Sequence, residues 1–118
     1  MERKYKLLLV DDDDIFRTAC HDYFTTHGFL VDTAADGEEG LQKLQTDEFD
    51  VALLDLKMPK LDGLQLARQV DEKGLNTEVI MLTGYGDRND AVAAIKAHVR
   101  DWFDKGGLSM ILWKAGLS

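Results

Sequence analysis

Cysteine and long apolar runs are what this sequence most clearly lacks. Its one cysteine, Cys20, excludes an internal disulfide, and such scarcity is typical of proteins from a reducing compartment. No run reaches the ~18 apolar residues that a membrane-spanning helix needs. The first residues, MERKYK, lead straight into a strand-like segment and offer no secretory signal. We therefore expect a cytoplasmic protein that makes no use of a membrane.

Basic residues are also few. Lysine and arginine number 14 against 22 aspartates and glutamates, which gives a net charge of −8 and a pI near 4.7. This balance argues against direct nucleic-acid binding, which normally needs a basic face. The histidines at positions 21, 27 and 98 are scattered and show no zinc-ligand spacing.

The chain does have enough apolar sequence for one folded domain. It is 118 residues long and 45% hydrophobic, so we expect a single domain over residues 1–118, with no output domain. Short aliphatic segments alternate with segments of helical period. The expected strands are Lys6–Val10, Phe29–Ala34, Val51–Asp55, Val79–Thr83 and Asp101–Asp104. The expected helices cover residues 16–27, 38–45, 63–72, 87–97 and 108–115.

The order of these segments, strand then helix five times over, predicts the fold. We expect an α/β, doubly wound, flavodoxin-like structure with a five-stranded parallel sheet and helices on both faces. If the second strand lies outside the first, the strand order is 2-1-3-4-5, and the first, third, fourth and fifth strands converge at one edge. Ligands of such sheets bind at the carboxyl ends of the strands, where the strand order reverses.

Polar side chains stand at those strand ends. The first strand ends at Asp11 and Asp12, the third at Asp55, the fourth at Thr83 and the fifth at Lys105. Clustered carboxylates without soft ligands suit a hard divalent cation such as Mg²⁺. Asp55 could attack a phosphorus atom, while Thr83 and Lys105 could hold phosphoryl oxygens. The set indicates phosphoryl transfer.

The motifs that carry these residues resemble one known family. LLLVDDDD, DVALLDLKMPKLDG, VIMLTGYGD, AVAAIK and DWFDK, in this order, look like the receiver domain of two-component response regulators, the CheY-like superfamily. The resemblance covers nearly the whole chain, and DLKMPKLDG is its most specific part. It implies that Asp55 accepts the phosphoryl group. It also implies that Asp11, Asp12, Asp55 and the backbone carbonyl of Lys57 bind Mg²⁺.

Further roles follow from the same resemblance. Thr83 matches the switching hydroxyl residue of the family, and Lys105 matches the lysine that pairs with the phosphoryl group. Trp102 falls where the family has an aromatic rotamer switch, although an aromatic residue in a strand is also often part of the core. The side chains of Lys57 and Tyr85 flank the site and are expected to tune the lifetime of the phosphorylated state.

The implied function is that of a phosphorylation-switched signalling receiver. A histidine kinase or histidine phosphotransfer protein would donate the phosphoryl group. The domain would catalyse the transfer to Asp55 and its later hydrolysis without being a conventional enzyme. Phosphorylation would change the face formed by residues 87–97, Asp101–Asp104 and the last helix, and this face would control an output or form a homodimer.

The chain departs from the family pattern after Lys105. The family usually has Lys-Pro with a cis peptide at this point, whereas this chain has Lys105-Gly106-Gly107. Two glycines leave the backbone more conformational freedom. We therefore expect a looser loop that holds Lys105 less rigidly.

Two alternatives belong to other functional classes. DDDDI, residues 11–15, comes close to the D-x-D-x-[TV] signature of haloacid-dehalogenase-like phosphatases, in which Asp11 would be the nucleophile and Asp13 the acid/base. That interpretation leaves the motif around Asp55 unexplained; in the receiver interpretation, Asp13 and Asp14 simply begin a helix. The second alternative is a pseudo-receiver, an interaction module with the same fold but no chemistry.

Overall fold

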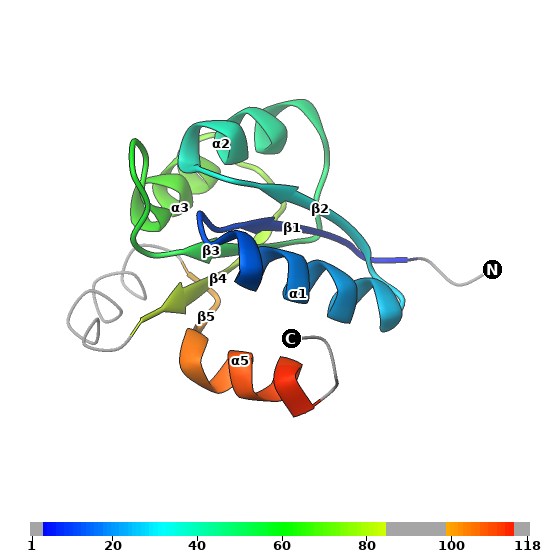
Figure 1. Ribbon diagram of the computed structural model, residues 1–118. Coiled ribbons are helices and arrows are strands. Elements are labelled where there is room, and N and C mark those ends of the chain that lie inside the picture. Colours follow the sequence, from blue (N-terminus) through cyan, green and yellow to red (C-terminus); the bar gives the residue numbers. More distant parts are fainter. Residues whose placement is uncertain (1–3, 85–98, 115–118) are drawn as a thin grey trace.

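The computed structural model describes residues 4–84 and 99–114 (Figure 1). The strands are β1 (Lys6–Val10), β2 (Leu30–Ala34), β3 (Val51–Asp55), β4 (Glu78–Thr83) and β5 (Asp101–Asp104). The helices are α1 (Asp14–Thr26), α2 (Gly37–Thr46), α3 (Gly63–Glu72) and α5 (Lys105–Lys114). The helix expected over residues 87–97, and Tyr85 with it, lie outside the described residues. None of the helices in the described ranges is long and apolar enough to cross a membrane.

The five strands form one parallel sheet in the order β2-β1-β3-β4-β5. The predicted fold class and strand order are therefore confirmed. β1 lies between β2 and β3, so the order reverses between β1 and β3, and the carboxyl ends of these two strands flank the reversal. The bounds of β1, β3 and β5 are those predicted, while β2 begins one residue later and β4 one residue earlier.

The sheet has an apolar core on each face. Leu8 and Val10 of β1 belong to a cluster with the buried side chains of α2 and α3, whereas Leu7 and Leu9 belong to a cluster with those of α1 and α5. Figure 1 shows the same arrangement, with α2 and α3 on one side of the sheet and α1 and α5 on the other. Burial on both faces explains why the central strands β1, β3 and β4 read as nearly continuous hydrophobic runs.

Side chains at the helix ends explain where the helices begin and end. The Asp13 carboxylate accepts hydrogen bonds from the backbone N–H groups of Ile15 and Phe16, which makes Asp13 the N-cap of α1. Gly28 follows α1 with φ of 92°, a left-handed conformation that glycine adopts without strain. The expectation that Asp13 and Asp14 begin the first helix is therefore confirmed.

The last helix differs from its prediction. It was expected from residue 108, but α5 begins at Lys105. The Asp104 carboxylate accepts hydrogen bonds from the N–H groups of Gly106, at 2.7 Å, and Gly107, at 3.4 Å. Because these bonds satisfy amides that a helix start leaves free, the two glycines form the first helical turn and not the loop that we predicted. Reduced rigidity of Lys105 stays a prediction.

Candidate functional site

The strand-end residues meet at the carboxyl edge of the sheet. Asp11 directly follows β1, Asp55 ends β3 and Thr83 ends β4. All three are buried, with exposed fractions of 0%, 6% and 3%. Lys105 follows β5 as the first residue of α5, and its side chain reaches back over the edge to the carboxylates. The sheet thus brings together residues from the start, middle and end of the sequence.

The Lys105 ammonium lies between two buried carboxylates. Its Nζ atom is 2.9 Å from Oδ2 of Asp11 and 3.7 Å from Oδ2 of Asp55. The same Nζ atom lies 4.7 Å from the ring centroid of Phe16, which places the cation over the aromatic face. The lysine predicted for this site is therefore in contact with both carboxylates.

Burial shifts the pKa values of these groups. Desolvation, reinforced by the negative charge of Asp11, raises the pKa of Asp55 to about 7, although Lys105 acts in the opposite direction. Desolvation also raises the pKa of Asp11 above the ordinary range of an aspartate, against the effects of the Asp13 N–H and Lys105. Burial alone would lower the pKa of Lys105. The hydrogen bond to Asp11 and the negative charges of Asp11 and Asp55 outweigh burial and raise this pKa. When both are ionised, the two buried carboxylates carry more negative charge than one lysine neutralises, and the raised pKa values reflect the cost of that charge.

Three carboxylates are arranged as a cation site. One oxygen from each of Asp11, Asp12 and Asp55 lies within 4.8 Å of the others. Oδ2 of Asp11 is buried, and within the described ranges no donor reaches it with hydrogen-bond geometry, although Nζ of Lys105 is close. An all-oxygen set with an unsatisfied buried carboxylate oxygen fits a hard divalent cation. Lys57 lies in the loop after β3, and its backbone N–H hydrogen-bonds to the Asp55 carboxylate.

Thr83 and Trp102 lie on the same face of the sheet. The Thr83 hydroxyl donates a hydrogen bond of 3.3 Å to the carbonyl of Phe103 and is thus turned toward β5. Trp102 is paired with Met81, two residues before Thr83 on β4, and side chains two residues apart on a strand share a face. Trp102 is half-buried and packs against the core cluster on the α2 and α3 side.

Residues outside the predicted set hold the loop after β3. A Cβ atom at Gly37 would lie 1.7 Å from the carbonyl oxygen of Leu61, so only glycine fits where the start of α2 meets this loop. Lys60 has φ of 71°, and its Nζ atom lies 3.5 Å from Asp36 and 3.8 Å from Glu38. These contacts are not predicted from the sequence, in which the glycine after Asp36, in AADG, is their only sign.

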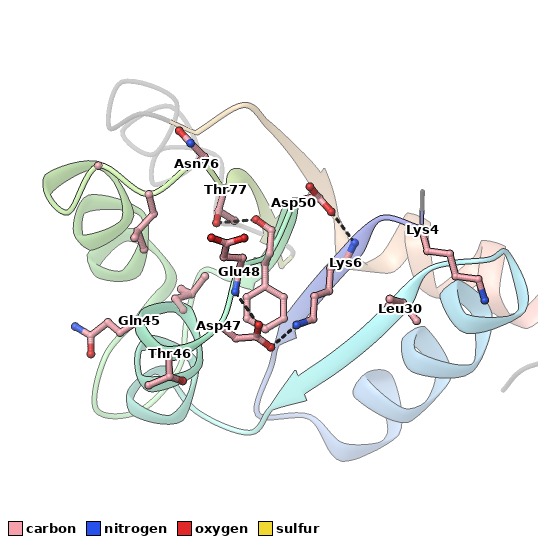
Figure 2. A pocket seen from close by; sticks show the side chains of 14 residues that line it. Lys4, Lys6, Leu30, Gln45, Thr46, Asp47, Glu48, Asp50, Asn76 and Thr77 are labelled. Atoms are coloured by element: carbon pink, nitrogen blue, oxygen red, sulfur yellow. Dashed lines mark hydrogen bonds and ion pairs between the residues drawn. The ribbon is translucent and has the colours of Figure 1, made fainter. Parts of the chain in front are cut away.

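A surface hollow at the opposite edge of the sheet is separate from this site (Figure 2). It is lined by the start of β1 and by the segments that precede β3 and β4. The Lys6 ammonium pairs with Asp47 and lies 5.3 Å from the ring centroid of Phe49. The backbone N–H of Lys6 also donates to Asp50 at 2.8 Å. These contacts tie the amino ends of the strands together, and the strand-end residues discussed above do not line the hollow.

Comparisons with known proteins agree with the geometry. Residues 7–110 match the family described as response regulator receiver domain. The alkaline phosphatase synthesis transcriptional regulatory protein PhoP of Bacillus subtilis is 34% identical over 100 residues, which cover 85% of this chain and 42% of PhoP. The chain thus spans less than half the length of that relative. Neither the phosphatase nor the pseudo-receiver alternative is supported by these matches.

Solved structures give the same result. A response regulator receiver domain protein from Clostridium thermocellum has a TM-score of 0.80 and 29% identity, covering 94% of this chain and 93% of that one. The receiver domain of the Francisella response regulator 1452 has a TM-score of 0.81 and 28% identity, covering 96% and 99%. With the family match over most of its length and an acidic strand-end site, this chain belongs to the response regulator receiver domains, which are signalling receivers switched by phosphorylation.

Proposed function

We propose that the protein accepts a phosphoryl group on Asp55. The observation that supports this most directly is the position of Asp55 at the end of β3, beside the reversal of strand order, with Lys105 Nζ at 3.7 Å and Asp11 and Asp12 next to it. A phosphoryl group on this carboxylate would have a cationic partner on one side and an acidic cluster suited to a metal on the other.

The acidic cluster would hold Mg²⁺. Asp11, Asp12 and Asp55 would supply carboxylate oxygens and Lys57 its backbone carbonyl. When bound, the cation would offset the negative charge of the carboxylates and of the incoming phosphoryl group. Support comes from the excess of carboxylates over the one lysine, and from the buried Oδ2 of Asp11, which no donor of the described residues meets with hydrogen-bond geometry.

The reaction would be an in-line transfer from a phosphohistidine of a histidine kinase or a histidine phosphotransfer protein. A carboxylate oxygen of ionised Asp55 attacks phosphorus, the P–N bond breaks, and its electron pair stays on the imidazole of the donor. Lys105 would attract the phosphoryl oxygens, and the Thr83 hydroxyl would donate a hydrogen bond to one of them after turning from the Phe103 carbonyl. Hydrolysis of the acyl phosphate would reset the protein.

The output would pass through the surface around β5. Inward movement of Thr83 would leave space on the face that it shares with Trp102, and the indole would follow. Phe103, whose side chain points to the opposite face of β5 from Trp102, and the side chains of Met110, Ile111 and Trp113 on α5 are exposed apolar groups beside this strand. This surface would contact an output partner or a second copy.

The test is phosphotransfer with radiolabelled acetyl phosphate and Mg²⁺, comparing the wild type with Asp55→Asn and Asp11→Asn. We expect an acid-labile, hydroxylamine-sensitive label on the wild type and none on Asp55→Asn. Label that persists in Asp55→Asn but is lost in Asp11→Asn would instead favour the phosphatase alternative. A wild type that takes up no label from acetyl phosphate or from any histidine kinase would favour the pseudo-receiver.

A further inference from the structure

The aromatic ring of Phe16 lies under the Lys105 ammonium. Phe16 lies in the first turn of α1 and is 6% exposed, so its ring is held by the core. The Lys105 Nζ atom lies 4.7 Å from the ring centroid, within the range of a cation–π interaction. The side chain of Lys105 is itself largely buried, which removes much of the water that would otherwise weaken such a contact.

The local backbone gives Lys105 little other support. Two glycines follow it in the first turn of α5, and neither carries a side chain that could pack against the lysine stem. The carboxylates of Asp11 and Asp55 attract the ammonium. An ammonium at the end of a flexible four-carbon chain can pair with a carboxylate over a wide range of angles, so these ion pairs alone do not fix its position. A rigid ring on a neighbouring helix supplies a surface that limits where the ammonium can lie.

We infer that Phe16 is a positioning residue for phosphoryl transfer, acting through Lys105. Its ring holds the ammonium at the carboxyl edge of the sheet, where Lys105 meets the phosphoryl oxygens on Asp55. The inference rests on the proposed function. It adds to that function an aromatic residue of α1 that is neither a proposed Mg²⁺ ligand nor a proposed partner of the phosphoryl group.

The test is a double-mutant cycle between Phe16→Leu and Lys105→Met, read as the rate of labelling by radiolabelled acetyl phosphate with saturating Mg²⁺. Leucine keeps an apolar side chain at position 16 but removes the π face. We expect Phe16→Leu to slow labelling about two- to tenfold when Lys105 is present, in keeping with the size of a partly desolvated cation–π contact. In the Lys105→Met background, Phe16→Leu should have no further effect.

Phe49→Leu is the matched control. Phe49 is buried to the same degree and also lies under a lysine, Lys6, but at the opposite edge of the sheet. It should lower stability about as much as Phe16→Leu and leave the labelling rate unchanged. Replacing Phe16 by 3,4,5-trifluorophenylalanine, which keeps the shape of the ring and weakens its negative face, should reproduce the slowing.

A second readout needs no phosphorylation. The ¹⁹F resonance of 4-fluorophenylalanine at position 16 should shift on Lys105→Met, whereas the same label at position 49 should not. An unmoved resonance at position 16, or an equal slowing by Phe16→Leu in both backgrounds, would overturn the inference even if Asp55 is phosphorylated. If Lys105→Met labels at the wild-type rate, the proposed role of Lys105 fails, and the inference fails with it.

Discussion

Oδ2 of Asp11 lies 2.9 Å from Nζ of Lys105, although the two residues are 94 positions apart in the sequence. The contact joins the end of the first strand to the start of the last helix. Asp11 and Asp55 together carry two negative charges when ionised, against one positive charge on Lys105. The buried site therefore has an excess of negative charge that a proton or a cation can offset.

Removal of Asp11 should weaken Mg²⁺ binding. We expect Asp11→Asn to raise the dissociation constant for Mg²⁺ by roughly tenfold or more, because a buried ligand oxygen of the cluster loses its charge. Asp14→Asn is the control, since Asp14 belongs to the same acidic run but pairs with Arg17 on the surface of α1. Calorimetric titration gives both constants. Equal weakening in the two variants would mean that only the overall charge matters.

Replacement of Asp55 should stabilise the protein above neutral pH. The folded-state pKa of Asp55, about 7, lies above the ordinary 3.8, so the folded protein binds this proton more tightly than the unfolded chain. Stability is therefore lost as the pH rises from about 4 through about 7. We expect Asp55→Asn to raise the free energy of unfolding by roughly 1–3 kcal/mol at pH 8, and the gain to disappear near pH 4.

Urea unfolding in the presence of EDTA, repeated between pH 4 and pH 8, measures this difference. Asp32→Asn serves as the control, because Asp32 lies on the edge strand β2 and pairs with Lys43 on the surface. A gain of equal size at every pH would show that burial of an ionised Asp55 is not its cause.

Gly37 should be intolerant of any side chain. In Gly37→Ala, the new Cβ atom would lie 1.7 Å from the Leu61 carbonyl oxygen, and backbone atoms would have to move. We expect a loss of about 2–3 kcal/mol in unfolding free energy and weaker Mg²⁺ binding, because the displaced loop includes Lys57.

Gly107→Ala should change the free energy of unfolding in the opposite direction, and urea unfolding measures both variants. A Cβ atom at Gly107 meets no atom within 4 Å, and the residue lies in the first turn of α5. Alanine should therefore stabilise the protein by about 0.5–1 kcal/mol. If Gly37→Ala and Gly107→Ala behaved alike, the close approach at Leu61 would not be what requires glycine at position 37.

Trp102 should report phosphorylation through Thr83. In a Trp113→Phe protein, Trp102 is the remaining tryptophan, and we expect its fluorescence to change on addition of acetyl phosphate and Mg²⁺. Thr83→Ala should still be labelled but should lose most of this change, because its hydroxyl no longer moves toward the phosphoryl group. A full response in Thr83→Ala would assign Trp102 to the core alone.

Much of the site could be predicted because parallel strands end at a common edge. Asp55 and Thr83 end their strands and Asp11 and Lys105 directly follow theirs, so the proximity of the four follows from the topology. The start of α5 could not be predicted in this way. Gly106 and Gly107 favour a loop by intrinsic propensity, and the helix begins there because the Asp104 carboxylate accepts hydrogen bonds from both of their N–H groups.

The sequence by itself determined the alternation of strands and helices, the parallel sheet and the identity of the strand-end residues, because these depend on local periodicity and on general rules of chain connection. Only the tertiary structure decided that Phe16 lies under the Lys105 ammonium and that Gly37 touches the Leu61 carbonyl. In the sequence, Phe16 is one more apolar residue on a helical stripe. The contact between Phe16 and Lys105 depends on how α1 and α5 pack against the same face of the sheet, and this packing cannot be predicted from a local sequence pattern.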